Sequence, residues 1–288
     1  MEPAHVEVFG HRMAYREAGA GRPVVFLHGN PTSSLLWVDV VAELRDAHRC
    51  VAVDLMGMGA SDKLPGTGDE RYRLTEHARF LDEALRRLGL ERDVVLVGHD
   101  WGAVLAVDWA RRHPGAARGI AYAEAGVVPL SWVGGTGPDR DLFGALRSPE
   151  GERMVLTENV FIEQVLQAGT VRELLPHELE AYRRPFTDPG EGRRAMLTWA
   201  RQIPVDGLPR ESHDVVAAGA AYMAGSVVPK LLVRGEPGAV ITGRVLEQCR
   251  TWPAQQEVTV PGTHFLPHDS SARIATALRA WLASLPVR

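Results

Sequence analysis

Short apolar runs recur along this chain, and segments with the spacing of amphipathic helices separate them. Buried parallel strands have this continuous apolar character, whereas strands with one wet face alternate polar and apolar residues. The runs lie at 23–27, 50–53, 94–97, 119–122, 230–233 and 258–260. The helices between them are expected at about 33–45, 75–89, 101–113, 242–250 and 270–284. This alternation predicts an α/β protein with a mostly parallel, doubly wound sheet.

The pattern changes at two places. Residues 6–8 and 13–15 alternate polar and apolar side chains, which predicts an antiparallel hairpin at one edge of the sheet. Between 129 and 212, helical spacings occur without a strand, amid glycine and proline. We therefore expect a core domain formed by 1–128 and 213–288, with 129–212 inserted as a helical cap over the sheet.

Composition and charge narrow the functional classes. Of the 288 residues, 45% are hydrophobic and 24% charged, which suits one large domain with a buried core and not a disordered chain. Lys and Arg number 32 against 36 Asp and Glu, and this net charge of -4 disfavours nucleic acid as a partner. The weakly polar stretch at 215–228 is too short to span a membrane.

The N-terminus lacks the apolar segment of a secretory signal, so a cytoplasmic location is expected. The two cysteines, Cys50 and Cys249, are too few for a disulfide framework or a metal cluster, and we expect both to be free thiols.

The strongest chemical signal follows the apolar run at 94–97. In open parallel sheets, ligands bind beyond the carboxyl ends of the strands. Here the run leads through Gly-His-Asp-Trp-Gly at 98–102 into a helical pattern. This is the frame of a strand–turn–helix nucleophile elbow, with Asp100 at the nucleophile position. An aspartate that attacks a saturated carbon leaves an ester, so Asp100 indicates displacement at an sp³ carbon. The helix N-terminus after the elbow is expected to favour its ionised form.

Hydrolysis of such an ester requires a histidine that activates water. His264 follows the last apolar run in Gly-Thr-His-Phe at 262–265 and is the candidate base. His268 lies four residues further on. Pro267 interrupts the helical spacing between the two, and no cluster of carboxylates and histidines surrounds them, so no metal site is expected.

An acid must orient the histidine, and two glutamates compete for this role. Glu124 follows the run at 119–122, and Glu236 follows the run at 230–233. Both stand at the carboxyl end of an expected strand. The pattern alone does not choose between them.

Hydrogen-bond donors converge on the same edge of the sheet. After the first core strand comes His-Gly-Asn-Pro at 28–31, where a backbone N–H of the loop and that of Trp101 can form an oxyanion hole. Asn30 and Trp101 also carry side-chain N–H groups, which suit an anion that leaves the attacked carbon. The segment 57–62 resembles the start of a dinucleotide fingerprint but lacks its third glycine, so no cofactor is expected.

With these residues in view, the sequence closely resembles the haloalkane dehalogenases of the α/β-hydrolase superfamily over nearly its whole length. The resemblance is carried by 28–34, 54–63, 98–102, 199–204 and 235–238. It implies an α/β-hydrolase fold with an inserted helical cap. It also implies hydrolysis of a small neutral haloalkane by water to an alcohol and a halide, through an alkyl-enzyme ester and without a cofactor.

The resemblance also implies residue roles. Asp100 is the nucleophile, His264 the base, and Asn30 with Trp101 the halide-binding pair. The chain looks like the subgroup whose acid follows the sixth strand, which implies Glu124, with Glu236 as the fallback. Lining of an apolar pocket is implied for Phe143, Phe161, Leu166 and Leu266. The Gly-rich stretch 131–138 departs from the bulkier, more charged cap segment expected of the family, and it bears on the substrate range.

Other functions remain as alternatives. Epoxide hydrolases share the aspartate nucleophile but typically protonate their leaving group with two cap tyrosines, and the expected cap contains only Tyr182. Haloacid-type relatives need a cation for the substrate carboxylate, and Trp101 stands after Asp100 where they have arginine. A coelenterazine-type luciferase resembles this sequence at the same positions, and some proteins of the fold bind ligands without turnover.

Overall fold

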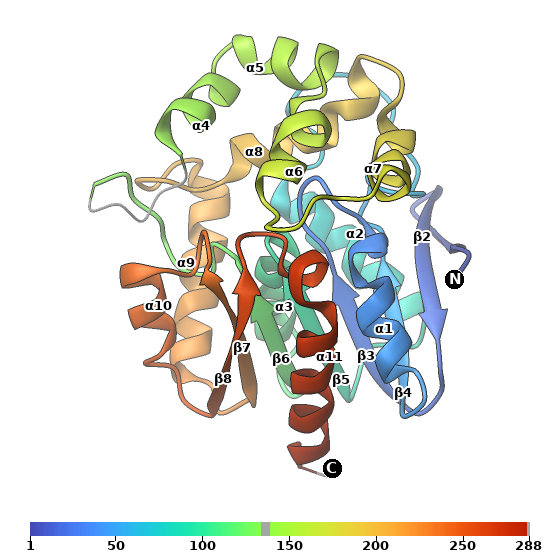
Figure 1. Ribbon diagram of the computed structural model, residues 1–288, viewed down its shortest axis with the longest axis vertical. Coiled ribbons are helices and arrows are strands. Elements are labelled where there is room, and N and C mark those ends of the chain that lie inside the picture. The colour runs from blue at the N-terminus through green and yellow to red at the C-terminus, as the bar shows by residue number, and fades with distance from the viewer. Residues whose placement is uncertain (134–138, 287–288) are drawn as a thin grey trace.

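The computed structural model, which describes residues 1–133 and 139–286, contains an eight-stranded sheet between two layers of helices (Figure 1). The strands are β1 (Ala4–Val8), β2 (His11–Ala18), β3 (Arg22–Leu27), β4 (His48–Val53), β5 (Val94–His99), β6 (Ala117–Ala123), β7 (Lys230–Pro237) and β8 (Gln255–Gly262). Their order across the sheet is β1-β2-β4-β3-β5-β6-β7-β8. The pairs β1–β2 and β2–β4 are antiparallel and the rest parallel, which confirms the predicted sheet and its antiparallel edge.

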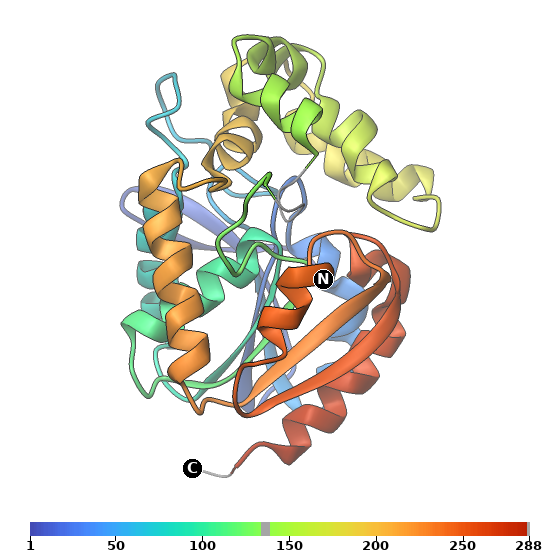
Figure 2. The ribbon, with the colours of Figure 1, turned by 90° about the vertical axis from the view of Figure 1, so that its left-hand side faces the viewer.

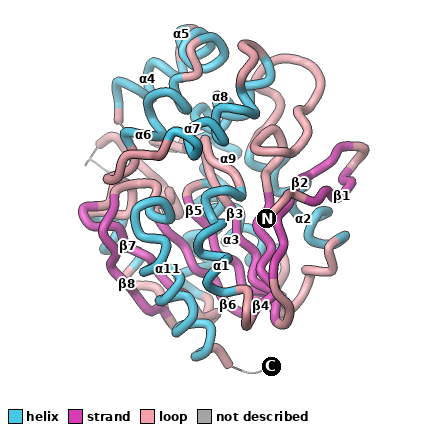
Figure 3. The backbone as a smooth tube through the Cα atoms, turned by 45° about the vertical axis from the view of Figure 1, so that its right-hand side comes forward, coloured by secondary structure: helices cyan, strands magenta, loops and turns pink. Residues whose placement is uncertain are grey.

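Helices cover both faces of the sheet, as Figures 2 and 3 show from two further sides. One face packs against α1 (Val38–Leu44) and α11 (Leu266–Ser284), and the other against α2 (Leu74–Arg87), α3 (Trp101–Arg112), α9 (Arg210–Gly225) and α10 (Gly243–Cys249). Consecutive side chains of β3 point to opposite faces of the sheet, and both faces are covered. Phe26 packs on the face with α1 and α11, and Leu27 on the face with α2 and α3, which explains why the sequence of this strand is apolar throughout.

Between β6 and α9, a group of helices lies above the carboxyl ends of the central strands (Figure 1). They are α4 (Arg140–Arg147), α5 (Glu150–Glu152), α6 (Leu166–Ala168), α7 (Pro176–Arg183) and α8 (Arg194–Gln202). Short 3-10 or π-helical turns are η1 (Ser34–Trp37), η2 (Arg153–Thr157), η3 (Phe161–Val165), η4 (Arg184–Phe186) and η5 (Glu191–Arg193). The end expected for the cap, residue 212, falls within the first turn of α9.

Two features of the helices differ from the sequence prediction. The prediction omits α9, whose small side chains give a weak amphipathic signal. They allow close packing on α3, because a Cβ at Gly219 would lie 3.1 Å from Val107 Cγ1. The prediction also begins the last helix at 270. In the structure α11 begins at Leu266, with a kink at Ser270 (φ -143°, ψ 34°), so the expected start coincides with the kink and a short turn precedes it. Pro267 was expected to interrupt a helix there, yet it occupies the first turn, where a missing N–H costs no hydrogen bond.

Within the described ranges, none of the helices has both the length and the apolar character needed to cross a membrane.

Candidate active site

Asp100 stands at a sharp turn between β5 and α3. Its φ of 52° and ψ of -126° lie outside the common regions for a residue with a side chain. The turn is also sterically tight. A Cβ at Gly98 would lie 2.4 Å from Ala103 Cα, and one at Gly102 would lie 2.1 Å from the carbonyl oxygen of Leu27. The two glycines of the motif are therefore required by close backbone approach, and they allow the turn to project Asp100 beyond the sheet.

Two backbone N–H groups hold the Asp100 carboxylate. The N–H of Asn30 donates to Oδ2 at 2.9 Å, and the N–H of Trp101 is also hydrogen-bonded to this carboxylate. The loop before Asn30 approaches so closely that a Cβ at Gly29 would lie 2.3 Å from Oδ2. An N–H of the loop after β3 and that of Trp101 were expected to form an oxyanion hole, and both hydrogen-bond the carboxylate of the nucleophile.

Burial raises the pKa of Asp100 to about 7, although the N–H groups of Asn30 and Trp101 act in the opposite direction. The nearby charge of Glu124 makes a smaller contribution to this increase of the pKa. The helix N-terminus was expected to keep Asp100 ionised, and its effect is outweighed by removal of the carboxylate from bulk water.

Replacement of Asp100 by Asn is expected to stabilise the fold mainly at alkaline pH. The carboxyl ionises near its ordinary value of 3.8 in the unfolded chain but near 7 in the fold. The stability of the native protein therefore falls as pH rises through this window, and Asn carries no such charge. The stability that the native protein loses across this window corresponds to at most about 4 kcal/mol, and water in the cavity that Asp100 faces reduces this value. Urea unfolding at about pH 5 and about pH 8 measures the part of this loss that falls between the two pH values, at most about 3 kcal/mol. Equal stabilisation at both pH values would contradict the argument.

The candidate base, His264, lies in the loop between β8 and α11, and this loop is fixed from two sides. The backbone N–H groups of His264 and Phe265 and the hydroxyl of Thr263 all donate to the carbonyl oxygen of Gly169, at 3.1, 2.9 and 2.8 Å. From the elbow, His99 Nε2 contacts the carbonyl oxygen of His264 at 2.8 Å. Burial lowers the pKa of His264 to about 4, so the ring is neutral and able to accept a proton at neutral pH.

The two candidate acids differ in their surroundings. Glu124, just after β6, is fully buried, and its Oε2 accepts the N–H groups of Ala239 at 2.8 Å and Val240 at 2.7 Å. The side chain of Glu236 is 67% exposed and lies 3.5 Å from Arg234.

Within the described residues, no hydrogen bond joins either acid to His264. However, Glu124 Oε1 and His264 Nδ1 are both buried and lack a partner in that part of the chain. A buried acceptor and a buried ring nitrogen that each lack one hydrogen bond favour Glu124 over Glu236 as the acid.

A cavity of about 440 Å³ opens above the elbow, and its lining is mostly apolar. It is lined by Asn30, Asp100, Trp101, Val104, Gly126, Leu130, Asp139, Leu142, Phe143, Phe161, Val165, Ala168, Gly169, Ile203, Pro204, Ala239, Val240, His264 and Phe265. The nucleophile, the candidate base and both members of the expected halide-binding pair thus face one cavity. A pocket of this size suits a small apolar ligand.

The expected lining needs a correction at two positions. Phe143 and Phe161 line the cavity, but Leu166 and Leu266 do not. Leu166 packs into the core on one face of the sheet, and Leu266 into the core on the other. The residues one position earlier, Val165 and Phe265, line the cavity instead, because neighbouring residues of a helical turn point in different directions. Of the Gly-rich stretch at 131–138, residues 134–138 lie outside the described part of the chain.

Residues without an assigned role in the sequence also contribute to the site. The amides that hold Glu124 come from Ala239 and Val240, which follow the conspicuous Gly-Glu-Pro-Gly segment at 235–238. Val104 lies three residues after Trp101, so helical spacing places it on the same face of α3. That spacing was a signal that could have identified it.

The chain is similar to known proteins over nearly its whole length. A family model described as alpha/beta hydrolase fold matches residues 22–271. The haloalkane dehalogenase of Sphingobium indicum is 47% identical over 284 residues, covering 99% of this chain and 96% of that protein. That of Mycolicibacterium smegmatis is 44% identical over 281 residues, covering 97% of this chain and 90% of that protein. The crystal structure of haloalkane dehalogenase DbeA from Bradyrhizobium elkani superposes with a TM-score of 0.92 at 34% identity, covering 98% of this chain and 97% of that one. The likeness extends over the cap as well as the sheet.

Proposed function

The chain belongs to the haloalkane dehalogenase family within the α/β-hydrolase fold, and we propose that it hydrolyses small neutral haloalkanes through Asp100, His264 and Glu124. The observation that carries this proposal is the position of the nucleophile. Asp100 projects from a strained elbow into a mostly apolar cavity, beside two side chains with N–H donors. A carboxylate in such a place can displace a leaving group that departs as an anion.

In the first step, Asp100 Oδ1 attacks the carbon that bears the halogen. Oδ2 is already held by the N–H of Asn30, which leaves Oδ1 for the attack. The new carbon–oxygen bond forms as the carbon–halogen bond breaks, and the halogen leaves with the bonding electrons. The indole Nε1–H of Trp101 and one amide N–H of Asn30 stabilise the halide. The other amide N–H of Asn30 donates to the carbonyl oxygen of Met196 at 3.1 Å.

In the second step, His264 removes a proton from water, which attacks the ester carbonyl carbon of Asp100. Negative charge develops on Oδ2, where the N–H of Asn30 is already in place. The N–H of Trp101 is also hydrogen-bonded to this carboxyl group. The tetrahedral intermediate then releases the alcohol, which takes the proton from His264. Glu124 stabilises the imidazolium through the ring nitrogen Nδ1.

The surroundings of Tyr182 argue against the epoxide hydrolase alternative. Its hydroxyl lies 2.9 Å from His268 Nε2, its side chain is buried, and it is not part of the cavity lining. Tyr182 is thus not placed to protonate an alkoxide. His268 also contacts Arg172 at 3.3 Å. Together with Tyr182 and Arg172, His268 forms a partly buried polar cluster.

Replacement of Trp101 by Phe tests the leaving-group site. It keeps an aromatic ring but removes the indole N–H, and loss of one such donor costs about 2–4 kcal/mol of transition-state stabilisation. We expect the native protein to release bromide from 1-bromobutane, and the variant to do so about 30- to 1000-fold more slowly. Bromide release by the variant at the native rate, with the fold intact, would remove Trp101 from the site. Turnover of an epoxide or of coelenterazine, with no bromide released, would favour the alternatives.

A further inference from the structure

Both side chains of the proposed halide site contact the same helix of the cap. Asn30 Nδ2 donates to the carbonyl oxygen of Met196 at 3.1 Å. The ring of Trp101 stacks on that of Trp199, with centroids 4.6 Å apart and planes 29° apart. Met196 and Trp199 are three residues apart on α8 and so lie on one face of that helix. One turn of α8 thus contacts both residues of the proposed halide site, Trp101 at the elbow and Asn30 in the loop after β3.

Trp199 also stacks on a second ring. This ring is that of His77 of α2, with centroids 4.1 Å apart and planes 14° apart. Three rings therefore connect α2 in the core, α8 in the cap and the elbow. Both ring nitrogens of His77 and Nε1 of Trp199 are buried and lack hydrogen-bond partners within the described residues. Because these groups make no polar contacts there, ring stacking is the interaction that the two residues provide.

His77 can stack in this way because it is uncharged. Burial, with a smaller contribution from the neighbouring His28, lowers the pKa of His77 to about 3. A neutral imidazole stacks face to face on an indole without having to bury a charge.

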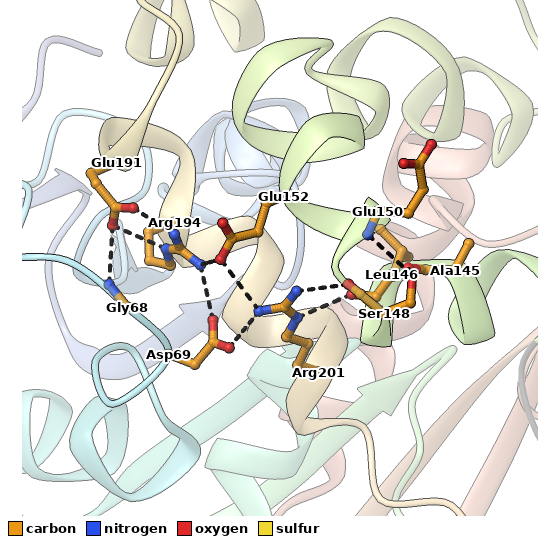
Figure 4. A network of polar contacts seen from close by, with 10 residues as sticks. All are labelled: Gly68, Asp69, Ala145, Leu146, Ser148, Glu150, Glu152, Glu191, Arg194 and Arg201. Carbon is orange, nitrogen blue, oxygen red and sulfur yellow. Dashed lines mark hydrogen bonds and ion pairs between the residues drawn. The ribbon is translucent and has the colours of Figure 1, made fainter.

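The helix that carries Trp199 is itself anchored. Arg194 and Arg201, near the two ends of α8, both pair with Asp69 in the core loop before α2 (Figure 4). Arg194 also contacts Glu152 at 3.0 Å, and Arg201 donates to the carbonyl oxygen of Ser148 at 3.0 Å. The side chain of Arg194 is only 3% exposed, whereas its partners Asp69 and Glu152 are 44% and 52% exposed, so a buried cation is held by carboxylates at the surface. This network ties α8 both to the core and to the rest of the cap.

We propose that Trp199 is a positioning residue for the halide site: its ring fixes the plane of the Trp101 indole and thereby directs the N–H of Trp101 toward the departing halide. The inference rests on the proposed function, because it concerns the leaving-group site of that reaction. Trp199 itself is fully buried and outside the cavity lining, so it acts through Trp101 and does not touch the substrate.

A double-mutant cycle tests whether Trp199 acts through Trp101. The Trp199→Phe and Trp199→Leu replacements are made in the native protein and in a Trp101→Phe background. The probes are the inhibition constant of bromide, at an ionic strength kept constant with sulfate, and the rate of the bromide burst from 1-bromobutane. The matched control is Trp109→Phe, because Trp109 is also buried and stacks on a histidine, His113, with centroids 4.4 Å apart.

In the native background, we expect Trp199→Phe to weaken bromide inhibition and slow the burst by about two- to tenfold, the factor that one aromatic stack is worth. Trp199→Leu should have the larger effect. In the Trp101→Phe background, both replacements should have no further effect, and hydrolysis of the ester should keep its native rate throughout. Trp109→Phe should leave all of these quantities unchanged.

Two results would overturn the inference. One is a Trp199→Phe variant with native bromide inhibition and a native burst rate. The other is an equal loss in both backgrounds, which would show that Trp199 supports the fold and not Trp101. Trp199→Phe decides the question even if Trp199→Leu fails to fold. If the native protein released no bromide, the proposed function would fail first and the inference with it. If Trp101→Phe had native rates, the role of Trp101 and the inference would fail, but not the proposed hydrolysis.

Discussion

Replacement of His264 by Phe is expected to stop the reaction after its first half. Asp100 needs no base to displace a halide, because a carboxylate is itself a nucleophile, whereas water must lose a proton before it can attack the ester. Phenylalanine keeps the size and planarity of the side chain. The backbone hydrogen bonds of this loop to Gly169 do not involve the imidazole, so the loop should stay in place.

Two measurements follow from this expectation. Mixing the His264→Phe variant with a bromoalkane should release about one equivalent of bromide per active site and then stop. Intact mass spectrometry should show the protein heavier by the alkyl group, with the added mass on the peptide that contains Asp100. Asp100→Ala is the control and should give neither burst nor adduct. Continuous turnover by the His264 variant would contradict the two-step ester mechanism.

Replacement of Glu124 by Gln is expected to reduce ester hydrolysis by about three to four orders of magnitude, the effect of the equivalent change in a serine hydrolase triad. The amide keeps an oxygen that can accept the N–H groups of Ala239 and Val240. It loses the charge that stabilises the imidazolium and can present an N–H where an acceptor is needed. The bromide burst should persist, because the first step does not use His264.

Glu236→Gln is the matched control for this replacement. This substitution changes the same functional group, also at the end of a parallel strand, but the side chain of Glu236 is 67% exposed. We expect this variant to keep the native rate in both steps. Rapid-quench measurement of bromide and alcohol separates the steps. A larger loss of hydrolysis in Glu236→Gln than in Glu124→Gln would transfer the role to Glu236.

The sequence was most informative where function depends on neighbouring residues. The elbow around Asp100 needs glycines two residues to either side, and this requirement lies within one short segment. The choice between Glu124 and Glu236 was different, because both follow an apolar strand. Their burial and hydrogen bonds separate them, and both depend on how β6 and the loop after β7 pack together. Family resemblance pointed to Glu124, and its surroundings now support that proposal.

Side-chain direction was the least predictable property. Leu166 and Leu266 were expected at the cavity, but Val165 and Phe265 line it. An error of one residue rotates a helical side chain by about 100°, and apolar neighbours give no pattern that would set the direction. The role we propose for Trp199 had no local signal either, since its ring contacts come from residues distant in sequence.

The carbonyl oxygen of Gly169 has a consequence for how molecules enter and leave. This single atom of the cap accepts hydrogen bonds from three consecutive residues of the loop that carries His264. A cap that swung away as a rigid body would break all three and displace the base in every cycle. We therefore expect substrate and products to pass between side chains while the cap stays closed. Permeability to bulky haloalkanes should then depend on the width of that passage, and shortening side chains along it should accelerate exchange without disturbing the chemistry.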